Sequence, residues 1–261
     1  MSRIAQAFQN GKAFIPFLTC GDPDLETTER LVSAMAEAGA DLIELGIPFS
    51  DPTAEGPVIM AASERALRGG ATTDKIFAMV RRLRKKISIP MVFMTYANVV
   101  YSYGTERFVK TAAEIGIDGL ILPDVPFEEK DEFLGDCRRF GLELISMIAP
   151  TSDERIDRIA KEAEGFLYCV SSMGVTGVRS RITTDLNAMI RRARAANPQL
   201  PCAIGFGIST PEQAEEMAGY ADGVIVGSAI VRMIGDLGAD AVEPVADYVR
   251  RMRAAANRSA E

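Results

Sequence analysis

Residues 43–57 read IELGIPFSDPTAEGP, and the interpretation of the chain starts from this stretch. A short apolar run carries a carboxylate, Glu44, and a loop rich in proline and glycine then brings a second carboxylate, Glu55. A charged group that emerges from an apolar strand is costly to bury unless something requires it there. Two acids at the end of one predicted strand indicate acid/base chemistry at that end.

The apolar run belongs to a series of similar runs with helical patterns between them. Runs that are hydrophobic throughout, without alternation, are typical of parallel strands covered by helices on their outer face. Between the strands, apolar residues recur at helical spacing, and in the first such segment Asp24 and Gly39 supply the start and stop signals. The predicted strands are residues 14–19, 42–46, 91–95, 119–122, 144–148, 166–170, 202–205 and 223–226, and clear helical patterns cover residues 26–38, 105–115, 128–140, 152–163 and 184–196.

Such strand and helix units, repeated over about 250 residues, predict an α/β fold of the (β/α)8 TIM-barrel type. An open doubly wound sheet is the alternative on pattern alone. An extra N-terminal helix over residues 4–8 is expected to cover the bottom of the barrel, and residues 254–261 are expected to fray. No low-complexity or charge-rich linker divides the sequence, so residues 1–261 are predicted to form a single domain.

Composition excludes several classes of function. A net charge of −7 disfavours nucleic-acid binding, which requires a basic face. The sequence has no apolar signal segment and no membrane-spanning run, so we expect a cytoplasmic protein. The 4 cysteines lack C-x-x-C spacing and are interpreted as reduced, buried thiols. Because the chain has no histidine, the usual zinc ligand and every Ser-His or Cys-His nucleophile are missing, and neither a metal nor a cofactor is expected.

Glycines follow the last two predicted strands, where TIM barrels bind phosphate. Gly205 and Gly207 follow the seventh strand, and Gly227 and Ser228 follow the eighth, at the predicted start of a short helix. Glycine lets the backbone approach an anion, and a helix N-terminus directs amide donors at it. The alternative is ordinary turn glycines. The segment GFGIST is no dinucleotide fingerprint, because the third glycine and the following acidic residue are missing.

The individual site residues have structural interpretations as well. Glu44 could be a carboxylate tied to a backbone donor or an arginine, Glu55 a solvated loop residue, and Tyr168 a core residue. The lysines narrow the chemistry, since all of them fall before strands or within helical segments. A Schiff-base aldolase is therefore not expected. A barrel with two carboxylates, a phosphate site and neither an electrophilic lysine nor a metal must use its substrate as the electron sink.

These motifs coincide with those of one family. Over essentially its full length the chain resembles the alpha subunit of tryptophan synthase, and the motifs occur in family order. The segments that carry the resemblance are FIPFLTCGDPD, IELGIPFSDPTAEGP, TYANVVYSYG, LPDVPFEE, GVTG, GFGIST and VGSAIV.

The resemblance implies a carbon–carbon lyase of tryptophan biosynthesis that cleaves indole-3-glycerol phosphate to indole and glyceraldehyde 3-phosphate. It implies that Glu44 protonates indole C3 and takes the glycerol hydroxyl proton, that Glu55 holds the indole N–H, and that Tyr168 lies near the catalytic acid. Thr176, in a mobile lid after the sixth strand, would reach the second carboxylate on closure. The remaining implied substrate contacts are Gly177, Gly207, Gly227 and Ser228 for the phosphate, and Phe17, Met94, Tyr96, Ile121 and Phe206 for the indole.

The resemblance also implies a partner. Asp51 and Pro52 match a loop that faces the beta subunit, a pyridoxal-phosphate enzyme that receives indole in an alpha-beta-beta-alpha heterotetramer. The chain itself would bind no pyridoxal phosphate. Three alternatives stay open: a catalytically weakened barrel that acts mainly as an allosteric partner, a phosphate-binding isomerase, and a lyase that works without a partner.

One departure from the family lies in the opening stretch. The family usually has aspartate where this chain has Glu55, and glutamine is common where it has Met60. The extra methylene of glutamate displaces the carboxylate by up to ~1 Å unless the loop shifts, and such a displacement costs about 10²-fold in rate. Either the loop compensates or the activity is reduced.

Overall fold

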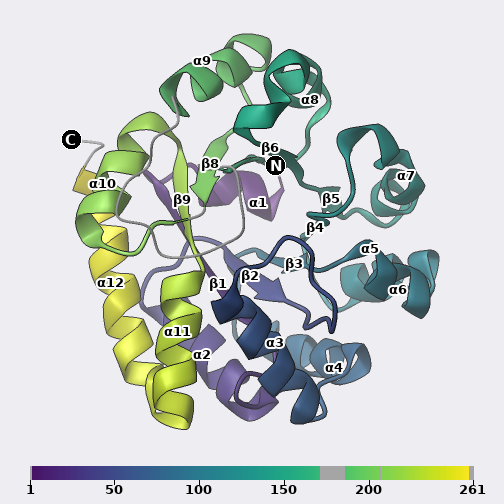
Figure 1. Ribbon diagram of the computed structural model, residues 1–261, viewed down its shortest axis with the longest axis vertical. Helices are drawn as coiled ribbons and strands as arrows, with labels where there is room; N and C mark the ends of the chain where they lie inside the picture. Colours follow the sequence, from purple (N-terminus) through teal and green to yellow (C-terminus); the bar gives the residue numbers. More distant parts are fainter. Residues whose placement is uncertain (1, 171–185, 206, 259–261) are drawn as a thin grey trace.

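The computed structural model describes residues 2–170, 186–205 and 207–258 of the chain. Within these ranges a 9-stranded parallel sheet is ringed by helices, as Figure 1 shows. The sheet order is β5-β4-β3-β2-β1-β9-β8-β7-β6, so that the first strand pairs with the last along the chain. The strands are β1 Ala13–Thr19, β2 Ile43–Gly46, β3 Met91–Met94, β4 Gly119–Ile121, β5 Glu143–Leu144, β6 Ser146–Ile148, β7 Leu167–Val170, β8 Cys202–Gly205 and β9 Gly223–Val226.

The predicted (β/α)8 barrel is confirmed, and the open doubly wound sheet is excluded by the pairing of β1 with β9. The predicted strand at residues 144–148 is divided at Ile145 into β5 and β6. Strand β5 pairs with β4, and strand β6 pairs with β7. The two ends of the sheet therefore meet at residues 143–148.

Helices fill the connections between strands. Those before residue 120 are α1 Arg3–Ala7, α2 Leu25–Glu37, α3 Pro57–Arg68, α4 Thr73–Leu83, α5 Ala97–Tyr103 and α6 Thr105–Glu114. Those after it are η1 Phe127–Glu129, α7 Asp131–Phe140, η2 Pro150–Arg155, α8 Ile156–Glu162, α9 Leu186–Ala196, α10 Pro211–Tyr220, α11 Ser228–Leu237, η3 Gly238–Ala241 and α12 Val242–Arg258. No helix in the described ranges has the length and apolar character needed to cross a bilayer.

The two ends of the chain differ in how well they were predicted. Helix α1 carries the fully buried Ile4, which belongs to the interior cluster together with Ala13, the first residue of β1, and Phe166, the residue before β7. This is expected for a helix that covers the barrel bottom. The expected fraying from residue 254 is wrong up to residue 258. Helix α12 stays regular there, because Ala255 and Ala256 are fully buried and the Asn257 side chain accepts a hydrogen bond from the Lys12 amide at 3.1 Å.

Side chains alternate between two apolar clusters. One cluster fills the barrel interior and takes Ile15 and Phe17 from β1, while the other lies between strands and helices and takes Phe14 and Leu18. In β2 the residues on either side of Glu44, Ile43 and Leu45, belong to the outer cluster. By the period of two along a strand, Glu44 therefore faces the interior.

Candidate active site

Glu44 is a carboxyl group buried in the barrel. Its side chain is 1 % exposed, and neither carboxylate oxygen has a hydrogen-bond partner among the described residues. Burial raises the pKa of Glu44 well above its ordinary value, and the nearby Glu55 carboxylate raises it further. The raised pKa favours the protonated form of Glu44, a proton donor with no acceptor among the described residues.

Glu55 is held by Tyr96 just before α3 begins. The Tyr96 hydroxyl donates a hydrogen bond to the Glu55 carboxylate, and its oxygen accepts one from the Ala54 amide at 3.1 Å. Burial raises the pKa of Glu55 to about 7, although the Tyr96 hydrogen bond opposes this rise. The Tyr96 ring packs against Phe49, with ring centroids 5.3 Å apart. Tyr96 thus fixes the loop that carries the second carboxylate. The family resemblance placed Tyr96 in the indole wall and did not predict these hydrogen bonds.

Tyr168 lies on the opposite side of the barrel, in β7. It is buried, and its pKa is raised by burial and then by the Glu44 and Glu55 carboxylates, so its hydroxyl stays neutral. The hydroxyl occupies the space above Gly205, where a Cβ atom would lie only 2.5 Å from the Tyr168 oxygen. Gly205, which the sequence grouped with the phosphate glycines, therefore serves to make room for this tyrosine.

The glycine at position 46 makes room in the same way for Phe17. A Cβ on Gly46 would lie 2.6 Å from the Phe17 ring, which is buried in the barrel interior. Phe17 also approaches Gly227 and is register partner of Glu44. The ring therefore lies between the acid of β2 and the loop after β9.

The far end of the site has the features of an anion cradle. Gly207 has a φ of +86°, a left-handed conformation that favours glycine. Gly227 is the N-cap of α11 and Ser228 is the first residue of that helix, so free amide donors and the positive end of the helix dipole lie here. Both loops line the same cavity as Glu44. One bound molecule can therefore place an anionic group at these loops while Glu44 acts on another part of it.

Most of the predicted site residues meet in one cavity. It brings together Phe17, Glu44, Glu55, Met94, Tyr168, Gly207, Gly227 and Ser228. Tyr96 lines an adjoining recess with Phe17, Glu55 and Met94, and the fully buried Ile121 packs in the same interior cluster. Thr176, Gly177 and Phe206 lie outside the described residues.

Other residues of the cavity were missed by the sequence. Ile225 is an inward residue of β9, and the uniformly apolar run at residues 223–226 gave no signal that separates it from its outward neighbours. Ala54 comes from the loop after β2, Ile59 comes from α3, and Pro123 follows β4. Asp51 is exposed and Pro52 half-buried in the loop before Glu55, and neither lines the cavity.

The fold and the site together define a TIM-barrel enzyme that applies acid/base chemistry to a substrate with an anionic group. A family model described as tryptophan synthase alpha chain matches residues 4–259. The tryptophan synthase alpha chain of Lacticaseibacillus casei is 46% identical over 255 residues, which are 98% of this chain and 96% of the relative. That of Shouchella clausii (strain KSM-K16) is 51% identical over 234 residues, 89% of this chain and 87% of the relative.

Solved structures agree with these relatives. The alpha subunit of tryptophan synthase from Legionella pneumophila str. Paris superposes with a TM-score of 0.88 at 37% identity and 99% coverage of both chains. The tryptophan synthase complex from Pyrococcus furiosus contains a chain that matches with a TM-score of 0.84 at 35% identity, covering 94% of this chain and 98% of its own. The chain belongs to the tryptophan synthase alpha chain family, and it is a carbon–carbon lyase of tryptophan biosynthesis. The isomerase and the non-catalytic barrel are not favoured.

Proposed function

We propose that the cavity around Glu44 cleaves indole-3-glycerol phosphate to indole and glyceraldehyde 3-phosphate. The observation that carries this proposal is the buried Glu44 carboxyl without a hydrogen-bond partner among the described residues, in a cavity that ends at the N-terminus of α11. The acid and the anion cradle match the two ends of this substrate, an indole ring and a phosphate.

The cleavage requires one proton at the indole ring and the loss of one from the glycerol chain. Glu44 donates its proton to indole C3, which turns the ring into an indolenine with a positive nitrogen. The ionised Glu44 then takes the proton of the adjacent glycerol hydroxyl, the hydroxyl oxygen becomes an aldehyde oxygen, and the C–C bond breaks. The electron pair of the broken C–C bond returns to the indole ring. Glu44 ends the cycle protonated because it has taken the hydroxyl proton.

Glu55 stabilises the ring while it carries positive charge. As a carboxylate it accepts the indole N–H, and the Tyr96 hydrogen bond keeps it aimed and lowers its pKa. The neutral Tyr168 hydroxyl lies close enough to both carboxylates for their charges to raise its pKa, so it adds no charge of its own to the site. The two acids thus have separate roles, set by their surroundings.

The rest of the substrate is held by the loops and walls of the cavity. Backbone amides around Gly207, Gly227 and Ser228 bind the phosphate. Thr176 and Gly177 lie outside the described residues, and their roles toward Glu55 and the phosphate rest on the family resemblance alone. The indole lies against Phe17, Met94, Tyr96, Ile121 and Phe206. The tight packing of Phe17 over Gly46 supports a fixed wall on one side of the ring.

The released indole passes to a tryptophan synthase beta subunit, a pyridoxal-phosphate enzyme that uses it to make L-tryptophan. The exposed Asp51 and the adjacent Pro52 contact this partner in a heterotetramer. The similarity to a chain of the tryptophan synthase complex from Pyrococcus furiosus supports the assembly. The chain works in the cytoplasm as a single domain spanning residues 1–261.

An indole-release assay with indole-3-glycerol phosphate tests the proposal. We expect the purified chain to release indole and a beta subunit to increase the rate. An aldose phosphate incubated in parallel should stay unchanged. Turnover of the aldose phosphate without any indole release would refute the lyase, and stimulation of the beta subunit by a chain that releases no indole would identify a non-catalytic partner.

A further inference from the structure

The barrel wall has a seam between β4 and β6. Strand β4 pairs with β5 through Gly119 and Leu120, and the ladder ends where the Ile145 amide donates to the Leu120 carbonyl at 2.9 Å. Strand β6 pairs only with β7 on its other side. Among the described strands no ladder joins β4 to β6, so the upper part of the wall is open at this point.

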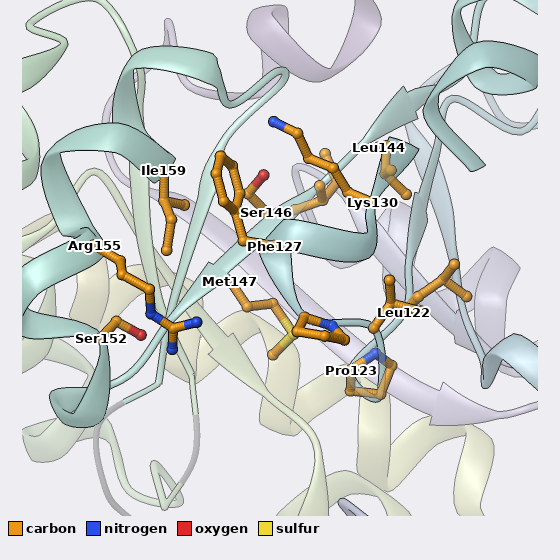
Figure 2. A pocket seen from close by; sticks show the side chains of 13 residues that line it. Leu122, Pro123, Phe127, Lys130, Leu144, Ser146, Met147, Ser152, Arg155 and Ile159 are labelled. Carbon is orange, nitrogen blue, oxygen red and sulfur yellow. The ribbon is translucent and has the colours of Figure 1, made fainter. Parts of the chain in front are cut away.

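A cavity of about 180 Å³ lies in this seam. One wall is the end of β4 and the loop after it, and the other is β6 with η2 and α8 (Figure 2). Pro123 lines both this cavity and the catalytic one, and Met147 also packs against the interior cluster. The seam cavity is therefore a neighbour of the catalytic cavity that shares a wall residue with it.

The lining favours a flat, neutral molecule. Phe127, Met147 and Ile159 supply apolar surface from three different elements, and the half-buried Ser146 supplies a hydroxyl (Figure 2). Both cations among the described lining residues are already matched by carboxylates: the Lys130 ammonium lies 2.9 Å from Glu162, and the Arg155 guanidinium lies 3.0 Å from Glu128. An anionic ligand would have to displace these carboxylates, whereas an aromatic ring would not.

We propose that the seam cavity is a second binding site for indole, the product that leaves the adjacent catalytic cavity. This inference rests on the proposed function for the identity of the product. Indole has one N–H donor, which the Ser146 hydroxyl accepts, and an apolar ring that fits against Phe127 and the Met147 thioether. The Lys130 ammonium lies 3.9 Å from the Phe127 ring centroid, which holds that ring in place.

Equilibrium dialysis of the full chain against indole tests the proposal. Because the chain contains no tryptophan, bound indole can also be followed by its own fluorescence. We expect two molecules of indole per chain. In the double variant Ser146→Val, Ile159→Phe the added bulk fills the seam, so one molecule per chain should remain, while Ile159→Val, which keeps the cavity open, should still bind two.

The same variants separate this proposal from the proposed function. Neither Ser146 nor Ile159 lines the catalytic cavity, so initial rates of indole formation should stay within about twofold of wild type. If the double variant does not fold, a crystal structure of the wild-type chain with indole decides, and density between Phe127 and Met147 is expected. One molecule of indole per wild-type chain, or an empty seam in that crystal, would overturn the second site even if the lyase reaction is intact.

Discussion

Replacing Glu55 by aspartate is the most informative perturbation of the site. The family resemblance leads us to expect aspartate at this position, yet the loop of this chain is arranged around the longer side chain. The Tyr96 hydroxyl donates to the Glu55 carboxylate while its oxygen is held by the Ala54 amide. Shortening the side chain by one methylene withdraws the carboxylate by about 1 Å. A hydrogen bond to a charged group contributes roughly 1.5–3 kcal/mol, which corresponds to about 10- to 150-fold in rate if it acts in the transition state.

We therefore expect Glu55→Asp to lower kcat/KM for indole-3-glycerol phosphate by about 10²-fold, measured by indole release at pH 8, with little change in thermal stability. The control is the same substitution in a Tyr96→Phe background. If the lost hydrogen bond is the cause, aspartate should cost at least tenfold less there, because the partner is already missing. An aspartate variant as active as wild type would refute the reasoning, and so would an equal loss in both backgrounds.

The pKa shifts and the packing give four further predictions. Because Glu55 must be ionised and its pKa is about 7, kcat should fall as the pH drops through about 7, and it should fall again at high pH as Glu44 loses its proton. Tyr96→Phe removes the hydrogen bond that lowers the Glu55 pKa, so the acid limb of the profile should move to higher pH, and an unmoved limb would assign it to another group. The folded state holds the Glu44 proton more tightly than the unfolded state, so this residue destabilises the fold as pH rises above its unfolded pKa of about 4.3. Glu44→Gln should therefore gain stability over wild type by up to about 1.4 kcal/mol per pH unit in urea denaturation between the unfolded and the folded pKa, whereas a pH-independent difference would argue against a buried ionisable acid. Gly205→Ala should destabilise the fold by about 1–3 kcal/mol and reduce turnover by displacing Tyr168, whereas Gly219→Ala, where a new Cβ meets no atom within 4 Å, should do neither.

The fold was predictable because its signals are local and repeated. Each strand is an apolar run bounded by turn residues, and the pairing of β1 with β9 follows from the number of such units. The break at Ile145 was not predictable, since the run at residues 144–148 is as apolar as an unbroken strand. Its division depends on which neighbour each half pairs with, and that is a property of barrel closure. The C-terminal tail was misjudged because small residues such as Ala255 look like a frayed end, although α12 buries them.

The site was predictable as a set of residue types but not as a set of contacts. Glu44 was predictable from its position within a predicted apolar strand, and Gly227 from its position directly after one. The bond between Tyr96 and Glu55 was not predictable, because it joins the loop after β2 to the N-cap of α5. The role of Gly205 was likewise hidden, since a glycine that accommodates a tyrosine from the neighbouring strand β7 and a glycine that binds phosphate look alike in a sequence.

The central claim is that Glu44 is the acid that drives the cleavage, and indole release by Glu44→Gln tests it most directly. Glutamine keeps the shape of the side chain but has no acidic proton to give, and general acid–base catalysis contributes about 10²- to 10⁴-fold. We predict a loss of kcat of at least about 10²-fold with substrate affinity largely kept, because Gly207, Gly227 and Ser228 are untouched. A Glu44→Gln variant that retains turnover close to wild type would contradict the account.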